Sequence, residues 1–152
     1  MVALLLISVL VGVFLERALY YRELAEKSAM EQVALDLRSS VNLRVAELVL
    51  ENRFAELGAM QAGNPMDLLA GKPRNYLGAL DDPQSGSSAP GNWYFDKKSK
   101  EVVYCVDLGR YFTPDESGRS CVSWHVVLVP GTDAASAPQW ARFGLVKPYR
   151  WF

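Results

Sequence analysis

Few side chains in this 152-residue sequence have a type and spacing suited to catalysis. The single histidine, His125, lies in the strand-like run SWHVVLV, with no nucleophile at a spacing that would suggest a catalytic pair. Residues 63–72, GNPMDLLAGK, superficially resemble a phosphate-binding loop. Their glycines are too far apart, however, and Pro73 stands where a magnesium-binding hydroxyl is required. We therefore expect no enzymatic activity, no cofactor and no small-molecule substrate.

The charged residues give equally little sign of a metal or a nucleic acid. Asp81-Asp82 and Asp115-Glu116 could supply oxygen ligands to calcium, but they lack EF-hand spacing, and solvated acids are common in loops. A bound ion stays an open alternative. The chain has 16 basic and 17 acidic side chains and a net charge of -1, without the basic stripe that phosphate backbones need. Nucleic acid is not an expected partner.

The two cysteines are the one pair of side chains with a clear possible reaction, the formation of a disulfide. Cys105 and Cys121 each lie in a strand-like run, and a turn-rich segment separates the two runs. Neighbouring strands in an oxidising compartment would allow a disulfide that closes a loop of about 15 residues and contributes roughly 3 kcal/mol. Two buried free thiols are the alternative. The spacing does not fit a zinc site.

The chain begins with an apolar segment that resembles a membrane helix. Residues 2–15 carry no charge, and only Ser8 and Gly12 dilute their apolar character. A bilayer core needs about 20 helical residues, so the segment must extend past Arg17, whose side chain can reach the headgroups, to Tyr20 and Tyr21. We expect residues 1–21 to form a membrane-anchoring helix, in which Ser8 and Gly12 allow another helix to approach closely.

Two alternatives to a membrane anchor stay open, and the orientation is ambiguous. A cleavable signal peptide would have a basic start and a small-x-small site, which the sequence lacks, and a buried core helix would not be apolar all round. The basic residues Arg17, Arg22 and Lys27 follow the segment, which by the positive-inside tendency would keep the rest of the chain cytoplasmic. A disulfide would favour the opposite side of the membrane.

The apolar segment is predicted to continue into a long amphipathic helix over residues 22–57. No proline or glycine occurs between Glu16 and Leu57, and Gly58 is a suitable C-cap. One apolar stripe contains Met30, Ala34, Leu37, Val41, Val45 and Leu48, and the opposite side carries Leu43, Ala46, Leu50, Phe54 and Leu57. Both apolar sides of such a helix must be covered, by its own domain or by a partner. We assign Leu43, Ala46, Leu50 and Phe54, together with Ser8 and Gly12, to a partner-helix interface; the alternative is a helix fully buried in its own domain.

Residues 58–152 are expected to form a loop region and an antiparallel sheet. Asn64 resembles an N-cap with Pro65 at the first position of a short turn. Strands are predicted at residues 93–95, 102–106, 122–129 and 139–146. Because one helix precedes all the strands, the fold class is α+β, with a long N-terminal helix packed against a small antiparallel sheet.

This layout resembles type IV pilins and type II secretion pseudopilins. Residues 64–83, NPMDLLAGKPRNYLGALDDP, and 90–106, PGNWYFDKKSKEVVYCV, are similar to accessory biogenesis proteins of the mannose-sensitive haemagglutinin (MSHA) pilus. Pilins carry a basic leader and a glutamate near the start of the mature helix, whereas residues 2–15 hold no carboxylate. The resemblance therefore implies an accessory component, with a missing leader or none, rather than a major subunit.

The expected function is assembly of a type IV pilus or a type II secretion-like filament. The resemblance implies a single-pass protein of the bacterial inner membrane with a periplasmic C-terminal domain. Its partners would be other pilus or secretion-system subunits. The alternative is a membrane-anchored periplasmic ligand-binding or sensor module whose aromatic sheet residues, Trp93, Tyr94, Trp124 and Trp140, line a pocket.

Overall fold

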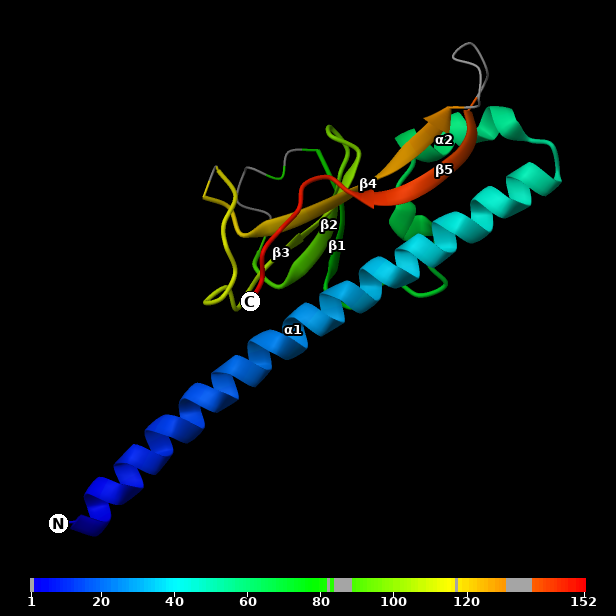
Figure 1. Cartoon of the computed structure of the whole chain (residues 1–152). Helices are drawn as coiled ribbons and strands as arrows, with labels where there is room; N and C mark the ends of the chain where they lie inside the picture. Colours follow the sequence, from blue (N-terminus) through cyan, green and yellow to red (C-terminus); the bar gives the residue numbers. More distant parts are fainter. Residues whose placement is uncertain (1, 82, 84–88, 117, 131–137) are drawn as a thin grey trace.

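One long helix and a five-stranded sheet make up the protein (Figure 1). The computed structural model describes residues 2–81, 83, 89–116, 118–130 and 138–152. The helical elements are α1 (Val2–Leu50), η1 (Phe54–Glu56), α2 (Leu57–Ala62) and η2 (Pro65–Leu68). The strands are β1 (Tyr76–Leu80), β2 (Asn92–Asp96), β3 (Glu101–Cys105), β4 (Cys121–Pro130) and β5 (Pro138–Leu145). The second half of α1 lies along the sheet domain and the first half projects from it.

The helix α1 ends earlier than the sequence predicts. Asn52 has the left-handed φ of 56°, and the N–H of Arg53 donates to the carbonyl of Leu48 at 2.8 Å, as in a Schellman C-cap. Asparagine tolerates this conformation better than most residues, so Asn52 ends the helix that we predicted to reach Gly58. The chain then turns back, which places Phe54 in η1 against the core and Leu57 in α2 at 0% exposure.

The sheet is mostly antiparallel, as predicted, and has one additional strand. Its strand order is β1-β2-β3-β4-β5, and the pairs from β2 to β5 are antiparallel. The predicted strands correspond to β2–β5, whereas β1 was not predicted and pairs with β2 in parallel. The run YLGAL contains Gly78, which has a φ of +95° and interrupts the register between Tyr76 and Ala79. Its weak strand pattern follows from that irregularity.

The core lies between α1 and one face of the sheet. The helix contributes the predicted stripe, in which Met30, Leu37 and Val41 are at most 1% exposed. The sheet contributes alternate residues of each strand, among them Trp93, Phe95, Val102, Tyr104, Val122, Trp124 and Val126. The other face carries a smaller cluster around the cysteines, with Tyr94 and Val103. This packing fixes the direction in which α1 leaves the domain.

The turn after α2 forms as expected. The side chain of Asn64 accepts a hydrogen bond from the N–H of Met66 at 3.1 Å, and Pro65 occupies the first position of η2. Met66 is fully buried and extends the core beneath the end of α1. Residues 65–68 therefore pack against α1, with Pro65 and Met66 buried.

Candidate functional site

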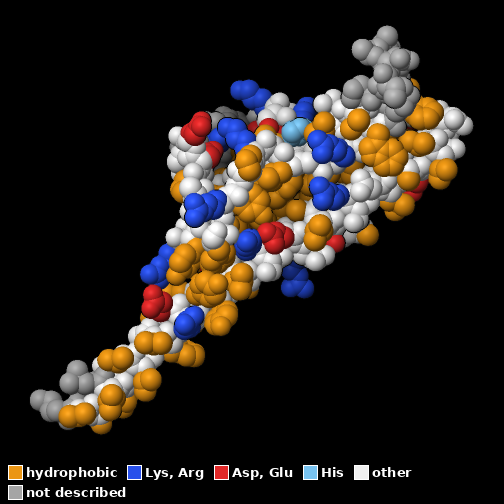
Figure 2. Space-filling model, in the orientation of Figure 1, with side chains coloured by type: hydrophobic (Ala, Val, Ile, Leu, Met, Phe, Trp, Pro, Cys, Tyr) orange, Lys and Arg blue, Asp and Glu red, His pale blue; other side chains and the backbone are white. Residues whose placement is uncertain are grey.

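The first part of α1 is an uncovered apolar rod. Every described side chain between residues 2 and 17 is exposed, and Figure 2 shows this part covered with hydrophobic side chains. The helix is long and apolar enough to cross a membrane. Charged side chains begin where the helix approaches the domain. An exposed apolar surface of this extent is typical of a segment that lies in lipid or against other helices.

Two glutamates join α1 to the sheet domain just beyond the rod. Glu26 accepts hydrogen bonds from the Tyr104 hydroxyl at 2.9 Å and from the N–H groups of Asp107 and Leu108 at 2.6 and 2.8 Å. Glu23, only 2% exposed, accepts from the N–H of Tyr111 at 2.8 Å and from Trp151 Nε1 at 2.9 Å. We call Glu23 and Glu26 the carboxylate clamp.

The clamp captures two segments that are distant in sequence. Residues 104–111 comprise the end of β3 and the segment after it, and Trp151 belongs to the segment after β5, which pairs with Phe112. Lys27 donates to the Trp151 carbonyl at 3.1 Å. The C-terminal segment therefore packs back against α1, where Trp151 and Tyr149 make hydrogen bonds to side chains of the helix. The clamp therefore fixes α1 to the end of the domain from which it projects.

The clamp was not predicted from the sequence, although a signal for it was present. Glu26 lies four residues before Met30, and Glu23 lies three residues before Glu26. Both therefore continue the buried stripe toward the N-terminus. Acidic side chains within a buried apolar stripe need hydrogen-bond donors from elsewhere in the fold, because a buried carboxylate without them is costly. The partners come mostly from backbone N–H groups, which no side-chain pattern can reveal.

Two tyrosines near the clamp have raised pKa values. Burial raises the pKa of Tyr104, and its hydrogen bond to the carboxylate of Glu26 raises it further. Burial together with the negative charge of Glu31 raises the pKa of Tyr149 to about 12, and the two side chains are joined by a hydrogen bond of 3.1 Å. Both hydroxyls therefore stay protonated donors at neutral pH.

The side of α1 that faces away from the domain carries an uncharged stripe. Its members recur every three or four residues, and all except half-buried Ala46 are exposed: Tyr21, Ala25, Ser28, Gln32, Leu35, Ser39, Leu43, Ala46 and Leu50. Leu43 and Leu50 are 64% and 83% exposed. We call this set the outer stripe. Small and apolar side chains with no charge on a helix surface suit packing against a second helix.

The residues predicted for the partner interface do not form one surface. Leu43, Ala46 and Leu50 belong to the outer stripe, whereas Phe54 packs against the core after the turn at Asn52. Gly12 and Met30 are five helical turns apart, so Gly12 and neighbouring Ser8 lie on the side of α1 that the domain covers further along. The structure thus separates the predicted set into two helix faces and a half-buried residue after the helix.

The predicted disulfide is present. Cys105 and Cys121 are directly opposed on β3 and β4, with Cα atoms 4.1 Å apart, slightly closer than the roughly 4.4 to 6.8 Å usual for disulfides. The bond joins the first residue of β4 to the last residue of β3 and so closes the long connection between them.

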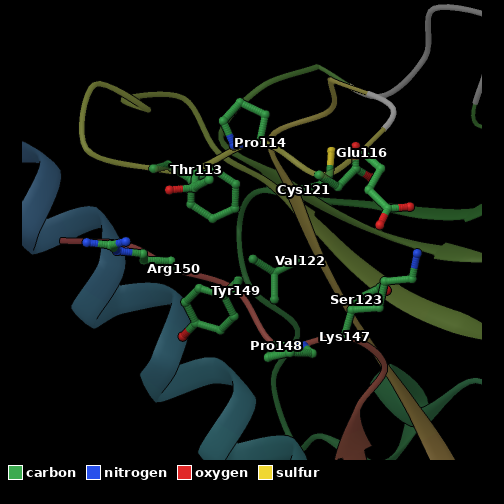
Figure 3. A pocket seen from close by; sticks show the side chains of 12 residues that line it. Thr113, Pro114, Glu116, Cys121, Val122, Ser123, Lys147, Pro148, Tyr149 and Arg150 are labelled. Carbon is green, nitrogen blue, oxygen red and sulfur yellow. The ribbon is translucent and has the colours of Figure 1, made fainter.

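The described part of the chain carries several surface grooves. Figure 3 shows one of about 510 Å³, lined by the loop before β4, the start of β4 and the segment after β5, including Glu116, Val122 and Tyr149. Trp93 lies in the core at 1% exposure, whereas Trp140 is 43% exposed. Tyr94 and Trp124 border two further, separate grooves.

The titratable side chains of the described residues are not clustered as metal ligands. Within those residues, no group of three or more histidine, cysteine, aspartate or glutamate side chains is placed to hold a metal ion. His125 lies in β4, and its Nδ1 is buried without a hydrogen-bond partner among the described atoms. Asp82 of the first acidic doublet lies outside the described residues.

Comparisons of the chain with protein-family models, curated proteins and solved structures give no match.

Proposed function

We propose that this protein is a non-enzymatic, membrane-anchored accessory component of a type IV pilus or type II secretion-like filament. It acts in assembly through contacts between helices. The observation that carries the proposal is the continuity of α1: an exposed apolar rod leads without a break into a helix whose outer stripe has no charged residue. A long N-terminal helix on a small sheet is compatible with a pilin-like fold.

The outer stripe gives the partner contact a specific chemistry. Leu35, Leu43 and Leu50 leave apolar area in water that a second helix would remove. Ser28, Ser39 and Ala46 are small enough to let that helix approach. The partner we propose is another anchored filament subunit, because both helices would then emerge side by side from one membrane.

The disulfide supports a location in an oxidising compartment. Structural disulfides persist outside the cytoplasm, and the bacterial periplasm is such a compartment. The protein would therefore be an inner-membrane component with its sheet domain in the periplasm. Within this class, the resemblance of residues 64–83 and 90–106 points to the MSHA pilus system.

Association in the native membrane tests the proposal. A cysteine placed at Ser39 in the full chain should form a crosslink to another pilus or secretion-system subunit, identified by mass spectrometry. The double variant Leu43→Lys, Leu50→Lys should reduce this crosslink at least tenfold. Leu77→Lys is the matched control, because Leu77 is 42% exposed on β1, away from α1. Unchanged crosslinking by the double variant, or crosslinks only to unrelated membrane proteins, contradicts the proposal.

A further inference from the structure

The domain has an aromatic and basic end where α1 leaves it. Tyr20 packs edge-on against Tyr111 and Phe152, with ring centroids 5.8 and 5.3 Å apart, and those two rings stack on each other at 5.2 Å. The guanidinium of Arg110 lies 5.8 Å from the Tyr111 ring and 3.8 Å from the carboxylate of Glu16. We call Arg17, Tyr20, Tyr21, Arg110, Tyr111 and Phe152 the foot.

The foot remains partly open to solvent even though its rings pack together. Tyr21 is 61% exposed, Tyr111 38% and Phe152 40%, and Arg17 and Arg110 are also exposed. The clamp holds the foot in place, because Glu23 accepts hydrogen bonds from the N–H of Tyr111 and from the indole of Trp151. The foot is therefore a rigid surface rather than a pair of loose loop ends.

The position of the foot along α1 sets its depth relative to a membrane. A hydrocarbon core of about 30 Å takes about 20 helical residues, so with residues 2–21 in the core Tyr20 lies at its boundary on the side of the domain. The headgroup layer beyond that boundary is about 5 to 8 Å thick. Tyr111 and Phe152, in contact with Tyr20, then lie at the inner edge of the headgroup layer.

The side chains of the foot match the chemistry of that layer. Tyrosine rings are enriched at membrane interfaces, where their apolar body and polar hydroxyl are both accommodated. Arg17 and Arg110 of the foot and neighbouring Arg22 are exposed basic residues, and Glu16 pairs with Arg110. Basic residues near the surface are attracted to anionic lipids.

We propose that the foot binds the headgroups of anionic phospholipids and so seats the sheet domain on the membrane that α1 crosses. The inference rests on the proposed membrane anchoring. Lipid contact on the domain itself, through Arg110, Tyr111 and Phe152, would fix the tilt of α1 and the direction in which the outer stripe faces its neighbours.

Hydrogen exchange of the full chain in lipid nanodiscs tests the foot. The amides of Tyr111 and Phe152 report how often the hydrogen bonds of the foot open, because the first donates to Glu23 and the second to the Tyr111 carbonyl. We expect both to exchange more slowly in phosphatidylcholine with phosphatidylglycerol than in phosphatidylcholine alone. Arg110→Gln should reduce this difference by about fivefold, and Arg110→Lys should retain most of it.

Two control variants separate lipid binding from other effects of Arg110. Glu16→Gln removes the ion pair but keeps the arginine, so the lipid dependence should persist; its loss would overturn the proposal. Arg142→Gln removes an exposed arginine from β5 and should change nothing. A fivefold loss in that variant too would indicate a nonspecific charge effect and overturn the proposal.

Vesicle flotation at alkaline pH distinguishes an absence of lipid binding by the foot from an absence of membrane anchoring by α1. A chain that floats with the vesicles but exchanges equally in the two lipid mixtures overturns the foot alone. A chain that does not float overturns the membrane anchoring on which the foot depends. Flotation together with slower exchange that requires Arg110 supports both.

Discussion

Glu23 is the residue on which the joint between helix and domain depends most directly. A buried carboxylate is costly unless donors surround it, and Glu23 has a backbone N–H and an indole N–H at 2.8 and 2.9 Å. Hydrogen bonds to a charged group are also stronger than neutral ones. Glu23 therefore provides both stability and a fixed geometry, which an apolar residue of similar size would not.

Replacing Glu23 by leucine should destabilise the protein by about 2 to 4 kcal/mol, because the N–H of Tyr111 and Nε1 of Trp151 lose their acceptor while staying buried. Urea unfolding in detergent, followed by tryptophan fluorescence, measures the change. Glu47→Leu is the matched control: Glu47 is exposed and pairs with Arg44, so its loss should cost less than about 1 kcal/mol. Equal effects of the two variants would show that the clamp is unimportant.

The disulfide should be a second strong contributor at this scale. Its cysteines are 16 residues apart, so replacing both by serine should cost about 2 to 4 kcal/mol, because the unfolded chain gains conformational entropy without the crosslink. Thermal unfolding with and without reductant gives the measurement. The reduced wild type and the double serine variant should melt at similar temperatures, below the oxidised protein. A wild type that is insensitive to reductant would contradict the prediction.

At the scale of elements, side-chain patterns predicted most of the fold. The buried stripe of α1, the strands β2–β5, the Asn64 cap and the disulfide all follow from spacing within one segment or from two similar segments. The missed features depend on backbone conformation or backbone donors. Gly78 disguises β1, Asn52 ends α1 without a glycine, and the clamp binds N–H groups that every residue possesses.

The turn at Asn52 has a consequence for the stability of α1. Its left-handed φ of 56° costs a β-branched residue about 1 to 2 kcal/mol, whereas glycine adopts it freely. Asn52→Val should therefore lower the free energy of unfolding by about that amount, and Asn52→Gly should leave it unchanged or raise it slightly. Denaturant unfolding of the two variants in the same detergent tests this. A glycine variant as unstable as the valine variant would contradict the assigned C-cap.

At the scale of the whole molecule, three surfaces lie along one rigid helix. The rod requires lipid or other helices, the buried stripe and the clamp hold the sheet domain, and the outer stripe stays available beyond the membrane. Because α1 is continuous through Leu50, the attachment at Glu23 and Glu26 determines the direction in which the outer stripe faces. This coupling is what a subunit acting by helix contacts needs.

The side of the membrane on which the sheet domain lies is the last prediction. The disulfide favours an oxidising compartment, while Arg17, Arg22 and Lys27 after the apolar segment favour the cytoplasm. We expect the disulfide to identify the correct side, because its cysteines lie opposite each other on adjacent strands. An alkaline phosphatase reporter fused after Phe152 should be active in bacterial cells. Cys105 and Cys121 should resist alkylation until a reductant is added.

Two controls make this result interpretable. The double serine variant carrying the same reporter should keep the phosphatase active, which shows that orientation does not depend on the disulfide. Substituting Arg17 and Arg22 by glutamine should leave the reporter active or raise its activity, because it weakens the signal for cytoplasmic retention. An inactive reporter with both thiols alkylated in untreated cells would place the domain in the cytoplasm. The proposed periplasmic assembly role would then be excluded.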